Sequence, residues 1–235
     1  MKKSALIFSM AAAVLLLASC DLDCIRGNGR ETTENRTLDE VSGIDVGGAY
    51  KLQLTCNEQQ SLVIRAEENL LPLIKTEVRN GKLYIYSDKD ICDKVEIAIH
   101  MNELTQVSVS GAVDIKSTNR FVTDTFELDG SGAVDINLEI EAKSIHTELS
   151  GAGEIEYRGK TGQHRVQISG AGSVKAFDLV AERYDLNISG AAACSVHATR
   201  ELNVHASGAA SVRYRGNPPV VNQDVSGAVS VSSAD

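Results

Sequence analysis

The tripeptide Ser-Gly-Ala recurs seven times between residues 110 and 228, at a nearly constant interval. Successive copies are 21, 19, 19, 20, 18 and 19 residues apart. They begin at Ser110, Ser131, Ser150, Ser169, Ser189, Ser207 and Ser226, and VGGAY at 46–50 resembles a degenerate earlier copy. A fixed period of this length is typical of a chain built from stacked repeats, each burying its apolar face against its neighbours.

Within each repeat, apolar residues alternate with polar ones. In one copy Phe126, Leu128, Val134 and Ile136 share a phase with two glycines, and acidic, serine and alanine residues fill the other phase. Strict alternation rich in Val and Ile predicts β-strands with one buried face, and no segment between the copies has a convincing helical period. The sequence therefore predicts an all-β solenoid with coils of about 19 residues.

The glycines of the repeat share the inward phase, so we expect them to face the interior of the coil, where a side chain would crowd the core. The Ser and Ala residues share the outward phase and would stack into one stripe. This stripe either reflects turn chemistry alone or forms an uncharged docking face. Its residues are Ser110, Ala112, Ser131, Ala133, Ser150, Ala152, Ser169, Ala171, Ser189, Ala191, Ser207, Ala209, Ser226 and Ala228.

Residues 1–19 predict a lipoprotein signal peptide. A short basic start precedes an apolar run that is too short for a comfortable membrane span, and the run ends in LLASC, which resembles a lipobox. Cys20 is then the expected lipidation site, which would anchor the protein to the outer membrane. An ordinary secretory signal cleaved nearby is the alternative. Asp21 and Asp23 resemble surface-export signals, so both a periplasmic and a surface-exposed position stay open.

The rest of the chain divides into three parts. Residues 20–38 are polar and predict a tether, 39–106 predict irregular N-terminal coils with a cap, and 107–235 predict the regular coils, continuous with 39–106 as one domain. Asn80-Gly81 marks a turn between two alternating runs. Pro218 and Pro219 interrupt the last repeats, and the final coil carries no obvious cap, so a homo-oligomer is a further expectation.

Composition excludes several classes of protein. The net charge of −9 argues against nucleic-acid binding, and four Phe, six Tyr and no Trp leave few aromatic platforms. Cys56 and Cys194 fall in apolar phases and predict small buried groups, whereas a disulfide among Cys24, Cys56 and Cys92 stays open. No metal-ligand spacing or cofactor motif is present.

The strongest candidate for chemistry is an acidic strip. Asp114, Asp135 and Glu154 occupy equivalent outward positions in three successive repeats, and Lys175 follows in the next. Stacked carboxylates repel one another unless a cation lies among them. The strip is either a solvated acidic surface or the acid/base machinery of a polysaccharide lyase or hydrolase. Among the five histidines, His146, His164 and His205 could meet on neighbouring faces as a metal site.

Four motifs occur in order along residues 38–232. They are VSGIDVGGAYKLQL, NLLPLIKTEVRNGKLYIYS, the repeated tripeptide SGA and VRYRGNPPV. Together they resemble the autotransporter adhesins with a head GIN domain, common among Bacteroidetes lipoproteins. The resemblance implies a right-handed parallel β-helix and transfers no catalytic residue. This chain departs from the repeat of many relatives by carrying Val or Ala in place of a second glycine in several copies, such as Val113 and Ala192.

These observations favour a non-enzymatic, lipid-anchored envelope protein that presents a repetitive surface, in adhesion or in contact with a glycan or protein partner. A carbohydrate-active enzyme using the acidic strip is one alternative. A structural envelope subunit that self-associates through the stripe or the last coil is another.

Overall fold

The computed structural model describes residues 24–235, and almost all of that part is β-strand. The all-β prediction is confirmed, and the described residues contain no α-helix. The elements are β1 (Glu31–Arg36), β2 (Gly43–Cys56), β3 (Ser61–Glu67), the 3-10 helix η1 (Leu71–Leu73), β4 (Ile74–Arg79), β5 (Lys82–Ser87), β6 (Glu96–Met101), β7 (Gln106–Ser117), β8 (Phe121–Arg215) and β9 (Val220–Ser233).

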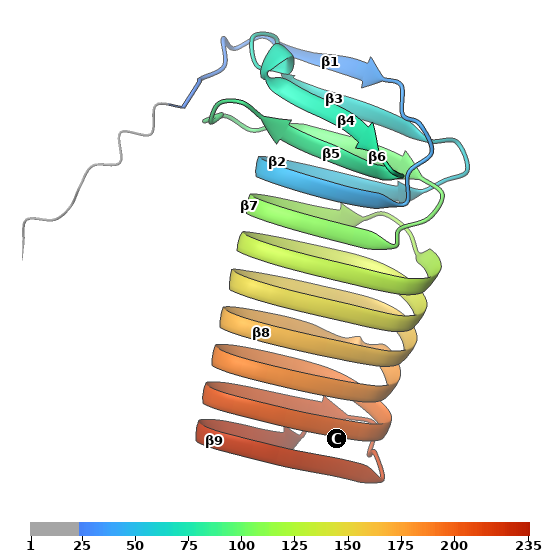
Figure 1. The fold of residues 1–235 in the computed structure, drawn as a ribbon, viewed down its shortest axis with the longest axis vertical. Coiled ribbons are helices and arrows are strands. Elements are labelled where there is room, and N and C mark those ends of the chain that lie inside the picture. Colours follow the sequence, from blue (N-terminus) through green and yellow to red (C-terminus); the bar gives the residue numbers. More distant parts are fainter. Residues whose placement is uncertain (1–23) are drawn as a thin grey trace, which may run out of the picture.

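Most of the chain winds as a continuous ribbon whose turns stack along one axis (Figure 1). β8 alone is 95 residues long and makes several of these turns. Parallel pairing joins β2 to β7, β7 to β8, and β8 to β9. Each inner turn therefore satisfies its backbone hydrogen bonds with the turns before and after it, which explains why a chain with no crossover helices can form parallel ladders.

The interior of the turns is filled by the inward phase of the alternation. Side chains such as Leu128, Ile136 and Ile155 are fully buried, and the neighbouring outward residues face solvent. Tyr157, Tyr184, Phe121 and Phe126 are the bulkiest fully buried groups. Because no coil can close this core alone, stability depends on contacts between successive coils.

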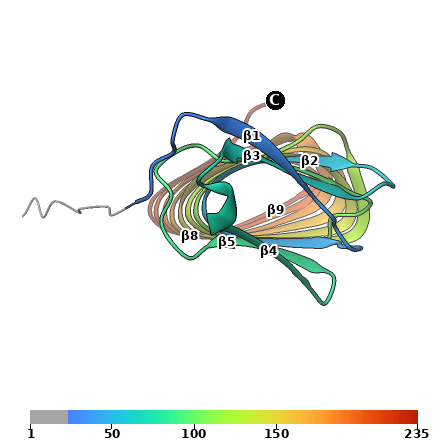
Figure 2. The same ribbon diagram turned by 90° about the horizontal axis from the view of Figure 1, so that it is seen from above.

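The N-terminal end of the stack is capped. There the pairing changes from parallel to antiparallel, since β3 runs against β6, β4 against β5, and β1 against β3. Seen from above, this layer and the short helical turn after β3 lie across the end of the coils (Figure 2). Leu70, Leu71 and Ile74 are buried there, so the apolar end of the core is covered.

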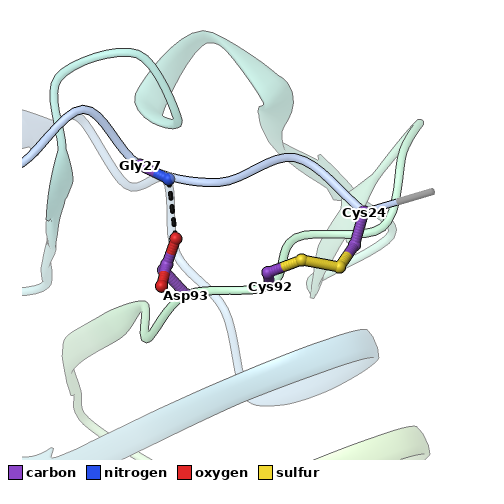
Figure 3. The surroundings of a disulfide bond; sticks show 4 residues. All are labelled: Cys24, Gly27, Cys92 and Asp93. Carbon is purple, nitrogen blue, oxygen red and sulfur yellow. Dashed lines mark hydrogen bonds between the residues drawn. A yellow bond between two sulfur atoms is a disulfide. The ribbon is translucent and has the colours of Figure 1, made fainter. Parts of the chain in front are cut away.

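The folded part begins earlier than residue 39. Within the segment predicted as a tether over 20–38, residues 31–36 form β1 and pair with β3. A disulfide joins Cys24 to Cys92, with their Cα atoms 5.3 Å apart, and the Gly27 backbone N–H donates to Asp93 Oδ2 at 2.6 Å (Figure 3). Residues 24–38 are therefore attached to the cap, a correction that polar composition alone could not supply.

The C-terminal end differs from the N-terminal end. β9 pairs with β8 after a loop that holds Pro218 and Pro219, as the two prolines predicted. Over residues 24–235, no helix is long and apolar enough to cross a membrane.

Candidate functional site

The Ser-Gly-Ala segments lie directly over one another. Ser110 pairs with Ser131 across β7 and β8, and Ser207 pairs with Ser226 across β8 and β9. Gly47-Gly48-Ala49 pairs with the first full copy, so VGGAY is an earlier member of the series. The stripe predicted from the outward phase is therefore a physical column, and all of its serines and alanines are exposed.

The central glycines do not face the interior, so that prediction was wrong. Gly111 and Gly132 are exposed and have φ values of 113° and 102°, in the left-handed region that L side chains rarely adopt. A Cβ on Gly132 would overlap the carbonyl oxygen of Gly111, and the same relation repeats from coil to coil. Glycine is required because the backbone kinks outward and lies against the preceding coil. By contrast, a Cβ on Gly153 would meet the Val134 side chain at 2.5 Å.

The serine hydroxyls do not form a hydrogen-bonded ladder. Ser131 donates to the carbonyl oxygen of Val109 at 3.2 Å, and no hydrogen bond joins two hydroxyls of this column within the described part of the chain. Most of these hydroxyls therefore remain available to a ligand.

A second column of outward side chains runs beside the serines, two residues earlier in each coil. We call it the polar column. In register order it contains Asp45, Ser108, Asp129, Glu148, Gln167, Asn187, His205 and Asp224.

Two hollows lie between the serines and the polar column, with volumes of about 400 and 410 Å³. Glu148 lines both hollows, so they adjoin along the stack, and we call the two together the serine groove. Its lining has four carboxylates and no Lys or Arg. The polar column has no sequence motif, because its residue types vary from coil to coil, and only its constant spacing of two residues before each serine marks it.

The acidic strip is formed, but its carboxylates have cationic neighbours. Asp114 pairs in register with Asp135, and Lys116 Nζ lies 3.5 Å from Asp114 Oδ1. Lys175 Nζ donates to Glu154 Oε1 at 2.6 Å, and this contact, together with nearby acidic groups, raises the pKa of Lys175. Surface ion pairs therefore neutralise much of the strip, as in a solvated charged face.

A wider and more apolar hollow of about 810 Å³ lies between this strip and the loop that carries Cys92. Its floor includes Ala112, Ala133 and Ala152, the alanine side of the column. The column thus borders two grooves, one polar and one apolar.

The three histidines proposed as a metal site do not converge. His164 is fully buried inside the coils, whereas His205 is exposed and lies 3.6 Å from Asp224 through Nδ1. No cluster of three or more potential metal ligands occurs over residues 24–235. Cys194 is buried as predicted, and burial raises the pKa of its thiol to about 12, whereas Cys56 is only half-buried. Cys20 lies outside the described residues.

The comparisons with known proteins agree with this architecture. A family model described as "putative auto-transporter adhesin, head GIN domain" matches residues 41–218. A solved structure of a putative adhesin from Bacteroides fragilis NCTC 9343 has a TM-score of 0.83 at 20% identity, and the alignment covers 89% of this chain and 99% of that one.

Two further solved structures are similar. A putative lipid binding protein from Parabacteroides distasonis ATCC 8503 has a TM-score of 0.66 at 23% identity, covering 90% of this chain and 99% of that one. A putative adhesin from Parabacteroides merdae ATCC 43184 has a TM-score of 0.65 at 19% identity, covering 91% and 100%. At these identities the likeness shows a shared fold.

Among curated proteins, none matches the sequence. The family model spans most of the chain, and the motifs that carried the resemblance fall almost entirely within the matched range. The chain therefore belongs to the family described as "putative auto-transporter adhesin, head GIN domain".

Proposed function

We propose that this chain is a non-enzymatic, lipid-anchored envelope protein, adhesin-like in role, that binds an extended polar chain along its serine groove. The proposal includes a right-handed parallel β-helix with coils of about 19 residues. The parallel register of successive Ser-Gly-Ala segments supports that winding, since each ladder step matches one sequence interval.

The observation that carries the proposal is the serine groove. It offers hydroxyl, carboxylate and amide groups that repeat at the spacing of parallel strands, about 4.8 Å per coil. Eight coils, from that of Asp45 to that of Asp224, line it, which corresponds to a length of about 34 Å. Such a surface fits a linear ligand lying parallel to the stack, with similar contacts at each coil.

The chemistry of the groove restricts the ligand. Asp45, Asp129, Glu148 and Asp224 give it a negative charge, so an anionic polysaccharide would be repelled. A neutral or amino-sugar glycan can accept and donate hydrogen bonds to the same residues. No Phe, Tyr or Trp lines the groove, so each coil contributes weakly, and useful affinity requires a chain that engages several coils together.

The acidic strip supports a non-enzymatic role better than a hydrolase. Acid/base cleavage needs one carboxyl group that stays protonated beside another that is ionised, which a water-poor cleft provides. Asp114 and Glu154 instead line a wide hollow that is open to solvent, and each lies beside a lysine, Lys116 or Lys175.

The anchor is the second part of the proposal. Lipid on Cys20 would lie four residues before Cys24, whose disulfide to Cys92 fixes that point to the cap. A short connection of this kind directs the capped end toward an outer membrane and β9 away from it. Display outside the cell follows if Asp21 and Asp23 act as an export signal.

A glycan array combined with a reducing-sugar assay tests the proposal. The full-length chain should bind neutral or amino-sugar oligomers and release no reducing ends from them. Turnover that disappears in Asp135→Asn would contradict the non-enzymatic role. The Cys20→Ala variant should leave the membrane fraction, and retention there would contradict lipid anchoring.

A further inference from the structure

Over residues 24–235, β9 lies at the edge of the sheet and leaves one side of its ladder unpaired. Within the described chain β9 pairs only with β8, through a parallel register that runs from Val220 to Ser233. The backbone N–H and C=O groups on the other side of β9 therefore lack a strand partner. An exposed edge of this length is a template for pairing with another strand.

The apolar end of the core is also uncovered at this coil. Ala206 is 5% exposed, but Val225, which occupies the same position in the next coil, is 42% exposed. Val229 and Val231 are likewise only half-buried, whereas their counterparts Ala210 and Val212 are buried. The row of side chains that fills every earlier coil thus ends in a surface of valines.

The two ends of the stack are protected differently. At the capped end, β1 carries Glu31, Glu34 and Arg36 among its six residues, and charged edge strands discourage pairing. The 14 residues of β9 include a single charged side chain, Asp224, and no proline. Nothing in β9 itself opposes association.

The sequence of β9 is nearly symmetric about Gly227. It reads Val225-Ser226-Gly227-Ala228-Val229. If two copies of β9 pair antiparallel around this glycine, Val225 of each faces Val229 of the other, and small residues face small residues. Asp224 then faces Ser230 of the second copy, so the carboxylates are not directly opposed.

We propose that two copies of this chain associate tail to tail through β9, in an antiparallel ladder centred on Gly227. A head-to-tail stack is blocked because the other end carries the charged, antiparallel cap, so the two-fold arrangement remains. A coil of about 19 residues has a perimeter of about 60 Å and encloses at most roughly 300 Å². This is well below the roughly 800 Å² per partner of a standard interface, so we expect weak association, with a dissociation constant of roughly 100 μM or more.

This arrangement has a consequence for adhesion, which rests on the proposed function. Two rods joined at β9 carry their capped ends at opposite extremities. With each cap held close to a membrane by Cys20, copies on one surface cannot pair in this way, whereas copies on facing surfaces can. The partner inferred for the rod tip is therefore a second copy of this chain on another surface.

Sedimentation of the full-length chain in a mild detergent, over micromolar to submillimolar concentrations, tests the pairing. We expect a reversible monomer–dimer equilibrium. The variant Val225→Asp should raise the dissociation constant by about 100-fold or more, because the symmetric interface receives two carboxylates. Val122→Asp is the matched control, since Val122 is 63% exposed and distant in sequence from β9, and it should leave the equilibrium unchanged.

A cross-linking experiment tests the register independently of any destabilising substitution. Under mild oxidation, the double variant Val225→Cys/Val229→Cys should form a covalent dimer, whereas the parent chain, with free Cys56 and Cys194, should not. A monomer at all concentrations, equal effects of the two Asp variants, or no cross-link would overturn tail-to-tail pairing. These outcomes are distinguishable from a failure of glycan binding, because most of the serine groove lies on the coils before β9 and only Asp224 and Ser226 lie in both regions.

Discussion

His164 Nε2 lies 3.0 Å from the hydroxyl oxygen of Thr147, and both side chains are fully buried inside the coils. The Thr147 hydroxyl is also 3.0 Å from the Tyr157 hydroxyl, and the His164 ring lies edge-on to Tyr157 with centroids 5.2 Å apart. His164 Nδ1 has no hydrogen-bond partner. The apolar core thus contains one polar group of three side chains, which is stable only while the imidazole is neutral.

This burial predicts a pH dependence of stability. Desolvation, with a smaller effect from His146, lowers the pKa of His164 from 6.5 to about 3. The unfolded chain therefore binds a proton between about pH 6.5 and pH 3 that the folded chain does not, so stability falls as the pH drops through that window. At pH 4 the loss from this group should be about 3 kcal/mol relative to pH 7.

Urea unfolding at several pH values measures this effect. The His164→Gln variant removes the titrating group, so its unfolding free energy should change with pH by about 3 kcal/mol less than that of the parent chain. His146→Gln, on the outside of the coil, should keep most of the dependence. An identical pH profile for the parent chain and His164→Gln would show that His164 is not buried as described.

The central glycines give a second prediction. Gly132→Ala should destabilise the chain by about 2–4 kcal/mol, because the residue has a positive φ and its Cβ would overlap the backbone of Gly111. Gly81→Ala is the control, since Gly81 has a φ of 73° but open space around its Cβ position. It should cost only about 1 kcal/mol. Thermal unfolding compares the two, and equal losses would contradict the close contact between coils.

Removal of the disulfide gives a third prediction. Cys24 and Cys92 are 68 residues apart, so Cys24→Ser/Cys92→Ser should destabilise the cap by about 2–4 kcal/mol. The loss should be local, with faster amide exchange in β1 and in the loop around Cys92 and little change in β8. Cys56→Ser, at a free and half-buried thiol, should have a small effect. Uniformly faster exchange along β8 would contradict the separation between cap and coils.

The sequence predicted the repeating part of this molecule well, because the residue pattern and the structure of that part share one period. Alternation predicts which residues are buried, and the constant interval predicts that Ser110 lies over Ser131, as the ladder register confirms. It failed at Gly111, where phase implied an inward residue and the backbone kinks outward instead. The alternation of inward and outward residues holds only for a regular extended strand. It cannot predict a residue with left-handed backbone angles inside that strand.

The cap and the serine groove were harder to predict from the sequence, for a different reason. The pairing of β1 with β3 and the disulfide depend on contacts between distant segments that carry no period. The polar column escaped notice because its side chains share a position and not a residue type, from Asp45 to His205. Only the ladder register shows that these residues form one surface with the serines.

The central claim is that the serine groove binds one extended polar chain across several coils. Calorimetric titration with neutral and amino-sugar oligomers, from dimer to octamer, tests it most directly. Affinity should rise with chain length in the parent chain, and Ser169→Arg, in the middle of the groove, should abolish that rise. Val180→Arg, an exposed position later in the same repeat and outside the groove, should preserve it. Affinity that is independent of length, or an unchanged rise in Ser169→Arg, would contradict the account.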